Sequence, residues 1–139
     1  FPGSFGSGFL YFMVPRVILF REEHSRRVFV PEVDFVSAAG SSPDHVYRRG
    51  GPYALVSNLC VFIYDRSRNR FRLDSLHPGT TLEEVRDNTG FDYDCSNDPI
   101  TTPRPEPERL DLIRDRIAGE LAETYPEFAS QRLGLTPQN

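Results

Sequence analysis

The sequence predicts a mixed α/β domain of modest size, in which strands come first and one long helix follows them. Two apolar, β-branched runs at Arg16–Phe20 and Tyr53–Tyr64 are typical of buried strands. Apolar residues then recur at helical spacing and mark one face of a helix, at Leu110, Ile113, Ile117 and Leu121. Several strand candidates are apolar on both faces, so we expect part of a layered α/β domain that needs cover from elsewhere.

The first part of the chain is expected to alternate between loops and strands. Residues 1–11 are rich in glycine and predict a loop, and Arg16–Phe20 predicts the first strand. Two further strands are predicted at Arg27–Val30 and Val33–Ser37, separated by a proline that cannot donate to a sheet ladder. Residues 38–51 contain turn-forming residues and predict a loop.

The central part predicts returning strands followed by a short helix. Tyr53–Tyr64 is the strongest β region, Asp65–Asn69 predicts a polar turn, and Arg70–Leu73 alternates as a half-exposed strand. Pro78-Gly79 predicts a tight turn before a helix at Leu82–Thr89.

Capping signals bound this short helix. Thr81 and Glu84 have the spacing of a capping box at its start. Gly90 is expected to adopt the left-handed conformation that ends a helix. Phe91–Asp94 then predicts a last strand.

A proline-rich segment divides the chain. The 139 residues are enough for one modest domain. Residues 1–94 are predicted to be its sheet-rich part, residues 95–107 an extended connector with four prolines, and residues 108–139 a helix and a tail. The helix is expected to start at about Pro107 and to end at Thr124.

The charge balance argues against nucleic acid and membrane partners. The chain carries 16 basic and 20 acidic residues, for a net charge of −4. No apolar run approaches the roughly 20 residues of a membrane helix. Two cysteines do not make a disulfide framework, and Cys60, in an apolar run, is expected to be a buried, inert thiol. This pattern fits a reducing cytoplasm.

The three histidines, His24, His45 and His77, lie outside any metal-ligand spacing, so no metal site is expected. Asp74, Ser75 and His77 are the residue types of a catalytic triad, but adjacency in sequence does not give triad geometry. We interpret the ring of His77 as a partner for the turn before Pro78.

The glycine-rich start has two open interpretations. Its order, G-x-x-G-x-G, is not a dinucleotide-binding fingerprint. It is either a structural turn or a place where the backbone approaches a ligand and offers an oxyanion donor.

Charged loop residues also have two interpretations. Arg48 and Arg49 either meet an anionic phosphate of coenzyme A (CoA) or are solvated, and solvation is the simpler reading. Glu22, Glu23 and Glu32 are interpreted as solvated carboxylates rather than catalytic ones.

Four stretches, in order, carry a resemblance to a known family. They are Pro2–Gly8 (PGSFGSG), His24–Val36 (HSRRVFVPEVDFV), Gly50–Phe62 (GGPYALVSNLCVF) and Ser75–Phe91 (SLHPGTTLEEVRDNTGF). The chain closely resembles the C-terminal portion of the β subunit of family I CoA-transferases, of the glutaconate CoA-transferase type.

The resemblance implies an open-sheet α/β fold, completed by a missing N-terminal segment of the β subunit and by an α subunit in an α2β2-like assembly. The family's nucleophilic glutamate, which forms a covalent thioester, lies upstream of the glycine loop. Because the chain begins at Phe1 within that loop, we expect a fragment without the nucleophile. No cofactor is expected, since the CoA thioester is the substrate.

The resemblance also implies the site residues. The backbone N–H of Gly6 is the candidate oxyanion donor, and the candidate substrate-binding residues are Gly3, Ser4, Phe5, Ser7 and Gly8. Phe5 stands where the family usually has glycine, and Gly8-Phe9 replaces its usual Asn-Asp. With Tyr11 nearby, these changes predict a reshaped, more apolar pocket.

The implied function is an enzyme subunit that acts on a short dicarboxylic or branched acyl-CoA of the glutaconyl-CoA type. It would act by CoA transfer, or by a derived decarboxylation as in a myxobacterial branch of the family. Two alternatives stay open: an acyl-CoA hydrolase of the same family, as in steroid degradation, or a non-catalytic structural subunit.

Overall fold

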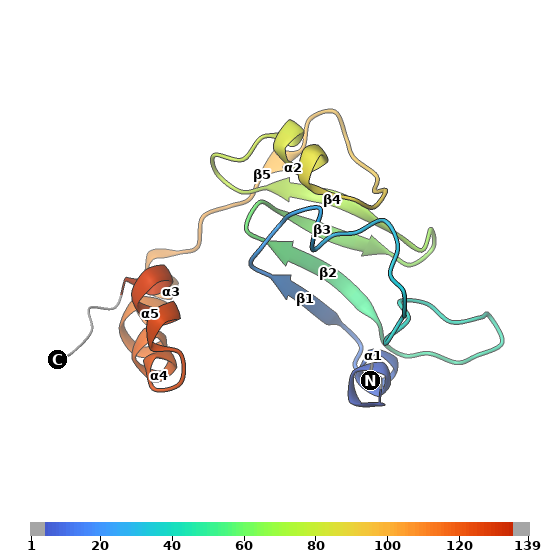
Figure 1. Ribbon diagram of the computed structural model, residues 1–139, viewed down its shortest axis with the longest axis horizontal. Coiled ribbons are helices and arrows are strands. Elements are labelled where there is room, and N and C mark those ends of the chain that lie inside the picture. The colour runs from blue at the N-terminus through green and yellow to red at the C-terminus, as the bar shows by residue number, and fades with distance from the viewer. Residues whose placement is uncertain (1–4, 135–139) are drawn as a thin grey trace. The chain divides into compact units, whose positions relative to one another are not determined.

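The computed structural model describes residues 5–134, which divide into two compact units (Figure 1). The first unit ends at Thr102 and holds a sheet with two helices, and the second begins at Pro103 and is helical. The division falls after the last strand, which still pairs with the sheet. No helix within the described residues is both long and apolar enough to cross a membrane.

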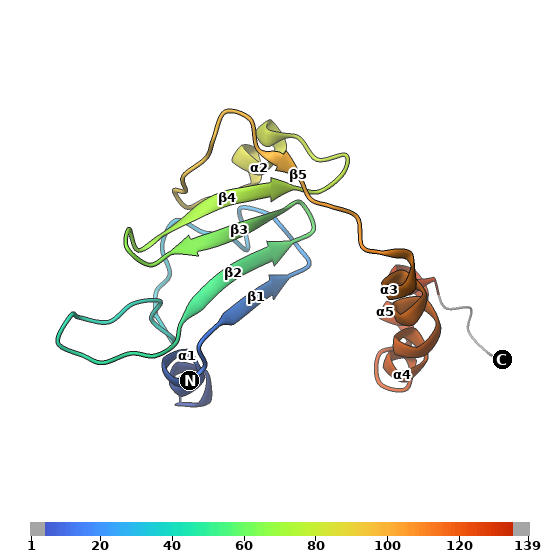
Figure 2. The same cartoon turned by 180° about the vertical axis from the view of Figure 1, so that it is seen from behind.

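The sheet of the first unit has five strands in sequence order, and Figures 1 and 2 show it from its two sides. The outer pairs β1–β2 and β4–β5 are parallel, and the inner pairs β2–β3 and β3–β4 are antiparallel. The strands are β1 (Val17–Arg21), β2 (Pro52–Ser57), β3 (Cys60–Asp65), β4 (Arg70–Leu76) and β5 (Ile100–Thr101). The predicted α/β class and the predicted strands that correspond to β1 through β4 are confirmed.

β1 is the strand at one edge of this sheet. Its side chains alternate, and Ile18 and Phe20 on one face are 62% and 69% exposed. The prediction that this apolar run is buried is therefore wrong for this chain taken by itself.

Two strands predicted after β1, at Arg27–Val30 and Val33–Ser37, are absent. The N–H groups of Val28 and Phe29 both donate to the carbonyl of Ser25, at 3.0 and 2.8 Å, so the backbone turns there. The β-forming side chains of this segment wrongly indicated strands. Phe29 is buried although its backbone lies in a turn, and most of the apolar residues after it are exposed.

The strand predicted at Phe91–Asp94 is reduced to one bridge. Only Asp94 pairs, with its N–H donating to Phe71 at 2.9 Å and its carbonyl accepting from Leu73 at 2.7 Å. The short strand β5, which the sequence did not reveal, takes the edge position beside β4 instead.

The core lies between one face of the sheet and the helix α2 (Leu82–Asn88). Phe62 on β3 and Val85 on α2 are completely buried, and the ring of Phe62 packs edge-on against Tyr93 at 4.9 Å between centroids. The buried residues of this cluster are Phe29, Leu55, Leu59, Cys60, Phe62, Leu73 and Val85.

The start of α2 is capped as the sequence predicts. Thr81 Oγ1 accepts a hydrogen bond from the N–H of Glu84 at 3.1 Å. The predicted turn before it is also confirmed, because Gly79 has φ = 90° and the N–H of Thr80 donates to the carbonyl of His77 at 3.0 Å.

The prediction that Gly90 ends α2 in the left-handed conformation is wrong, since its φ is not positive. Glycine is needed there for a different reason. The N–H of Gly90 donates to the carbonyl of Phe29 at 2.7 Å, and an added Cβ would lie 2.3 Å from that oxygen. A side chain at this position would break the contact between the α2 segment and the turn that holds Phe29.

The prediction of a loop at the glycine-rich start is wrong, because the helix α1 runs from Phe5 to Met13. The carbonyls at its C-terminal end find donors in a distant loop. Arg48 Nη2 donates to Tyr11 at 3.0 Å, and the N–H of Gly50 donates to Phe12 at 3.1 Å. These tertiary contacts satisfy groups that a short helix leaves unpaired, and local propensity does not reveal them.

The second unit is a helical segment followed by a second helix. The first segment consists of α3 (Pro107–Leu112), a π-helical turn η1 (Ile113–Ile117) and α4 (Ala118–Ala122), close to the predicted helix. The predicted tail instead contains α5 (Pro126–Leu133). Proline at the start of α5 and Gly134 after it, at φ = 72°, are the boundary signals of this helix.

Candidate functional site

The glycine-rich segment, which the resemblance singles out, opens helix α1. Gly3 and Ser4 lie outside the described residues. The first turn of α1 contains the other candidates, Phe5, Gly6, Ser7 and Gly8. Backbone N–H groups in the first turn of a helix have no acceptor within the helix, and an added Cβ at Gly6 would meet nothing within 4 Å. The oxyanion-donor role of Gly6 and the substrate-binding roles of its neighbours stay predictions.

α1 presents an apolar surface. Phe9, Leu10 and Met13 are 67%, 56% and 52% exposed. Tyr11 is half-buried, and burial raises the pKa of its hydroxyl. Within the described residues Phe9 faces solvent rather than a cavity, and the apolar pocket stays a prediction.

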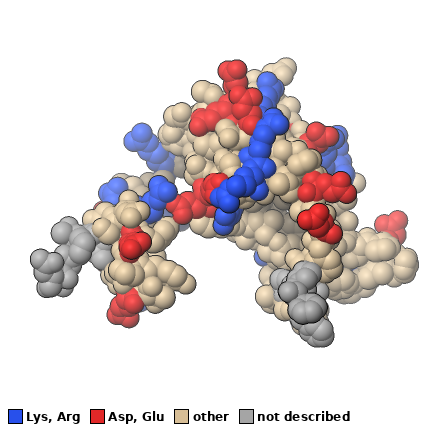
Figure 3. Space-filling view, in the orientation of Figure 1, with Lys and Arg blue, Asp and Glu red and all other residues tan. Residues whose placement is uncertain are grey.

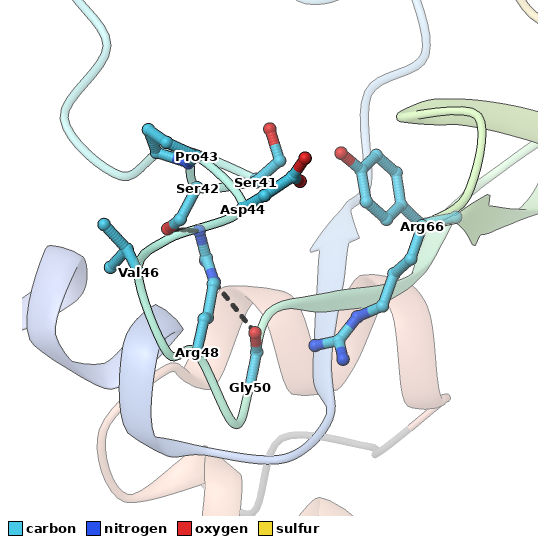
Figure 4. Close-up of a pocket in the computed structure, with 10 residues that line it drawn as sticks. Ser41, Ser42, Pro43, Asp44, Val46, Arg48, Gly50 and Arg66 are labelled. Carbon is cyan, nitrogen blue, oxygen red and sulfur yellow. Dashed lines mark hydrogen bonds between the residues drawn. The ribbon is translucent and has the colours of Figure 1, made fainter.

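A cleft of about 240 Å³ lies between the loop before β2 and the turn that joins β3 to β4 (Figure 4). Ser41, Ser42 and Asp44 line one side, and Arg48, Tyr64 and Arg66 contribute the other polar groups. The hydroxyl of Tyr64 hydrogen-bonds to Asn69, and burial raises its pKa. The lining is therefore mainly polar, with two guanidinium groups and one carboxylate.

Arg48 and Arg49 have different surroundings. Arg48 is partly buried, and its guanidinium donates to the carbonyls of Gly50 and Tyr11 at 2.8 and 3.0 Å. It also lies over the ring of Phe12, 5.4 Å from the centroid. Arg49 is exposed and is not among the residues that line the cleft. The solvated interpretation thus suits Arg49 and is wrong for Arg48.

A second group of polar side chains is buried beneath the sheet. His24 Nδ1 lies 2.7 Å from Ser57 Oγ, and its Nε2 lies 2.9 Å from Thr89 Oγ1. The N–H of His24 donates to Asn58 at 2.9 Å, and its ring packs edge-on against Phe29. Burial lowers the pKa of His24 to about 4, so its ring is neutral at pH 7. Through Ser57 and Thr89, the ring connects the stretch that begins at His24 with the two later stretches of the family resemblance.

His77 extends this group toward the last strand. Its Nε2 donates to the carbonyl of Ser57 at 2.9 Å, and its Nδ1 lies 3.0 Å from Thr102 Oγ1. Thr102 and Ser75 are also joined, at 2.8 Å between their hydroxyl oxygens. The ring of His77 thus bridges strands rather than only the turn before Pro78, and Asp74, Ser75 and His77 do not form a triad.

The remaining reactive groups are structural. Cys60 is fully buried, and burial raises the pKa of its thiol to about 12, which confirms the inert thiol predicted for it. Glu23 pairs with Arg27 at 2.6 Å and accepts from Ser25 at 2.7 Å, and these hydrogen bonds, that of Ser25 first, lower its pKa. Residues 5–134 contain no cluster of ligands that could hold a metal ion.

Acidic and basic side chains are interspersed on the face shown in Figure 3. A run of basic side chains crosses the middle of that face, with acidic side chains beside it.

Arg66 is the basic residue of the cleft that no sequence pattern singles out. It is 18 residues away from Arg48, in a turn of charged and polar residues that looks like any exposed hairpin end. Gly51 was the available signal, because a glycine pair before a strand often marks backbone that a side chain would obstruct.

Comparison with known proteins identifies relatives of one kind, although no protein-family profile matches the chain. The IpdB subunit of the cholesterol ring-cleaving hydrolase of Rhodococcus jostii is 40% identical over 97 residues, which cover 67% of this chain and 38% of the relative. The β subunit of glutaconate CoA-transferase from Acidaminococcus fermentans is 30% identical over 102 residues, covering 68% of this chain and 38% of the relative.

A solved structure agrees with these relatives. The decarboxylase AibA/AibB superposes with a TM-score of 0.65 at 30% identity, over 82% of this chain and 43% of that one. The chain spans 38% of the length of the two curated relatives named above. Its sheet, its ordered motifs and these relatives together show that the chain belongs to the β subunits of the family I CoA-transferases.

Proposed function

We propose that the chain is part of the β subunit of a heteromeric enzyme that acts on an acyl-CoA thioester together with an α subunit. The observation that carries the proposal is its similarity to the corresponding subunits of a CoA-transferase, a hydrolase and a decarboxylase. The CoA thioester is the substrate, and the proposal includes no further cofactor. Both cysteines are free, which supports a reducing cytoplasm as the place of action.

The reaction that we favour is hydrolytic cleavage of a ring carried by an acyl-CoA. The identity of 40% to the ring-cleaving hydrolase subunit exceeds the 30% to the transferase subunit, over stretches of similar length. The apolar side chains of α1 suit a bulky alicyclic group better than a small dicarboxylic acid.

CoA transfer to a small acid, or a derived decarboxylation, is the second candidate. It is supported by the transferase and decarboxylase relatives at 30% identity. Decarboxylation would use the same features, an apolar pocket around the leaving carboxylate and N–H donors toward the developing oxyanion. The N–H groups at the start of α1 supply such donors on either route.

Mass spectrometry of the products distinguishes these reactions. The complete β subunit, purified with its α partner, is incubated with a ring-containing acyl-CoA in isotopically labelled water, and separately with glutaconyl-CoA, with and without acetate. Hydrolysis adds one labelled water to the first substrate. Transfer yields acetyl-CoA only with acetate, and decarboxylation yields an acyl-CoA lighter by carbon dioxide without it. An unchanged mass for every thioester contradicts the proposal.

A further inference from the structure

The cleft beside β2 brings two cationic groups to one point of the backbone. If Gly51 carried a Cβ, that atom would lie 3.1 Å from Arg66 Nη2 and 3.4 Å from Arg48 Nη2. Both guanidinium groups therefore lie close to Gly51. Arg48 comes from the loop before β2 and Arg66 from the turn after β3 (Figure 4).

Arg48 is held in place without being neutralised. Its three hydrogen bonds go to the carbonyls of Gly50 and Tyr11 and to the hydroxyl of Ser42, the last at 3.4 Å. All of these acceptors are uncharged, so they orient the guanidinium and leave its positive charge uncompensated.

Arg66 is available to a ligand. Among the described residues it makes no hydrogen bond within 3.5 Å and no ion pair within 4.0 Å, and it is exposed at the rim of the cleft. Asp44 also lines the cleft but forms no ion pair with either arginine. Two guanidinium groups that converge without an ion-paired carboxylate repel each other, and an anion between them would relieve that repulsion.

Gly51 lets the two guanidinium groups lie close to the backbone. Its φ of 149° lies in a region that side-chain-bearing residues rarely adopt, and a Cβ there would press on both Nη2 atoms and lie 3.3 Å from the carbonyl of Gly40. The room for an anion lies beside that point, in the cleft of about 240 Å³ that both arginines line.

The donors of the cleft select among anions. Two guanidinium groups present several N–H donors from two directions, which suit the three terminal oxygens of a phosphate monoester better than the two of a carboxylate or a phosphodiester. The hydroxyls of Ser41 and Ser42 at the rim add neutral donors. We propose that this cleft binds a phosphate monoester and that, if the proposed function holds, its ligand is the 3′-phosphate of CoA.

Binding measured by calorimetry tests this proposal on the complete β subunit with its α partner. The probes are CoA, dephospho-CoA, which lacks the 3′-phosphate, 3′-phosphoadenosine 5′-phosphate and inorganic phosphate. The variant Arg66→Gln removes the free cation, Arg66→Lys keeps a charge without the fork, and Arg49→Gln is the matched control outside the cleft.

We expect Arg66→Gln to weaken the binding of CoA and of 3′-phosphoadenosine 5′-phosphate roughly tenfold, the loss of one charge-assisted contact. Dephospho-CoA should bind the wild type and Arg66→Gln equally, and Arg66→Lys should fall between them for CoA. Arg49→Gln should bind all probes as the wild type does. A thermal melt of each variant confirms that the fold is retained.

Equal affinity of the wild type and Arg66→Gln for CoA overturns the proposal. If Arg66→Gln weakens the binding of inorganic phosphate but not that of CoA, the cleft is an anion site, and its assignment to the 3′-phosphate of CoA is overturned. The proposed function fails separately: if no thioester is converted while 3′-phosphoadenosine 5′-phosphate binds through Arg66, the site stands and the enzymatic role does not.

Discussion

The buried histidine cluster and the arginine cleft are both built from polar side chains, but they differ in whether their groups are satisfied. Around His24, both ring nitrogens and the backbone N–H have partners between 2.7 and 2.9 Å. In the cleft, two charges converge and one of them has no partner among the described residues. Buried polar groups that all have hydrogen-bond partners stabilise the fold, whereas exposed charged groups without partners are suited to binding a ligand.

The largest effect should come from Ser57→Ala in the histidine cluster. Ser57 Oγ contacts His24 Nδ1 and accepts from the N–H groups of Leu59 and Cys60, both at 3.2 Å. Its removal leaves several buried groups unpaired, so the free energy of unfolding should fall by about 4 kcal/mol. Denaturant titration of the purified protein measures this, with the exposed Ser96→Ala as the control. A loss below about 1 kcal/mol would show that water replaces the hydroxyl.

The next effect is a pH dependence of stability due to His24. Burial lowers its pKa from 6.5 to about 4, so between these values the unfolded chain binds a proton that the native chain does not. Stability should therefore fall as the pH is lowered through this window, by up to about 3 kcal/mol, and His24 should add no slope above it.

Denaturation midpoints across the same pH range test this expectation. His24→Asn should be less stable at neutral pH but should lose this part of the slope, while the exposed His45→Asn should retain it. A slope that persists unchanged in His24→Asn would assign it to other groups.

A smaller effect is expected at Gly51, next to the two arginines of the cleft. Gly51→Ala places a Cβ at an unfavourable φ and against both arginines, so we expect a destabilisation of about 1–2 kcal/mol and the loss of phosphate binding. Gly119→Ala, where the added Cβ meets nothing within 4 Å, is the control. Calorimetry with inorganic phosphate, together with a thermal melt, separates the two losses. Retained phosphate affinity in Gly51→Ala would place the anion elsewhere.

The smallest effect on stability sharpens the contrast. Arg66→Gln should change the free energy of unfolding by less than about 0.5 kcal/mol, because the side chain contributes no ion pair within the described residues and its removal relieves repulsion with Arg48. The same denaturant titration measures it. A clear destabilisation would reveal a structural role and weaken the case for a binding site.

The parts of the fold that were predictable are those in which local pattern and tertiary structure agree. The run Tyr53–Tyr64 is rich in β-formers and does form β2 and β3, and Thr81 caps α2 as its spacing predicts. Where tertiary contacts decide, the sequence misled. Phe29 sits in a turn although its neighbours favour a strand, and α1 forms because a loop near Arg48 caps it.

The candidate sites follow the same division. Sequence motifs identified the glycine-rich segment and, through resemblance, its candidate role, and the described structure leaves that role untested. The cleft could not be predicted, because no spacing rule brings Arg66 to Arg48. Their approach depends on the pairing of β2 with β3 and on the backbone conformation of Gly51.

The exposed edge of the sheet at β1 bears on the amount of the polypeptide that a cell can maintain. Within residues 5–134, β1 pairs on one side only, with β2, and exposes Ile18 and Phe20, and such an edge readily pairs with other strands. We expect a copy that finds no cover for this edge to aggregate or to be degraded by quality-control proteases. The steady-state amount of the polypeptide would then follow the supply of whatever covers β1 rather than its own rate of synthesis.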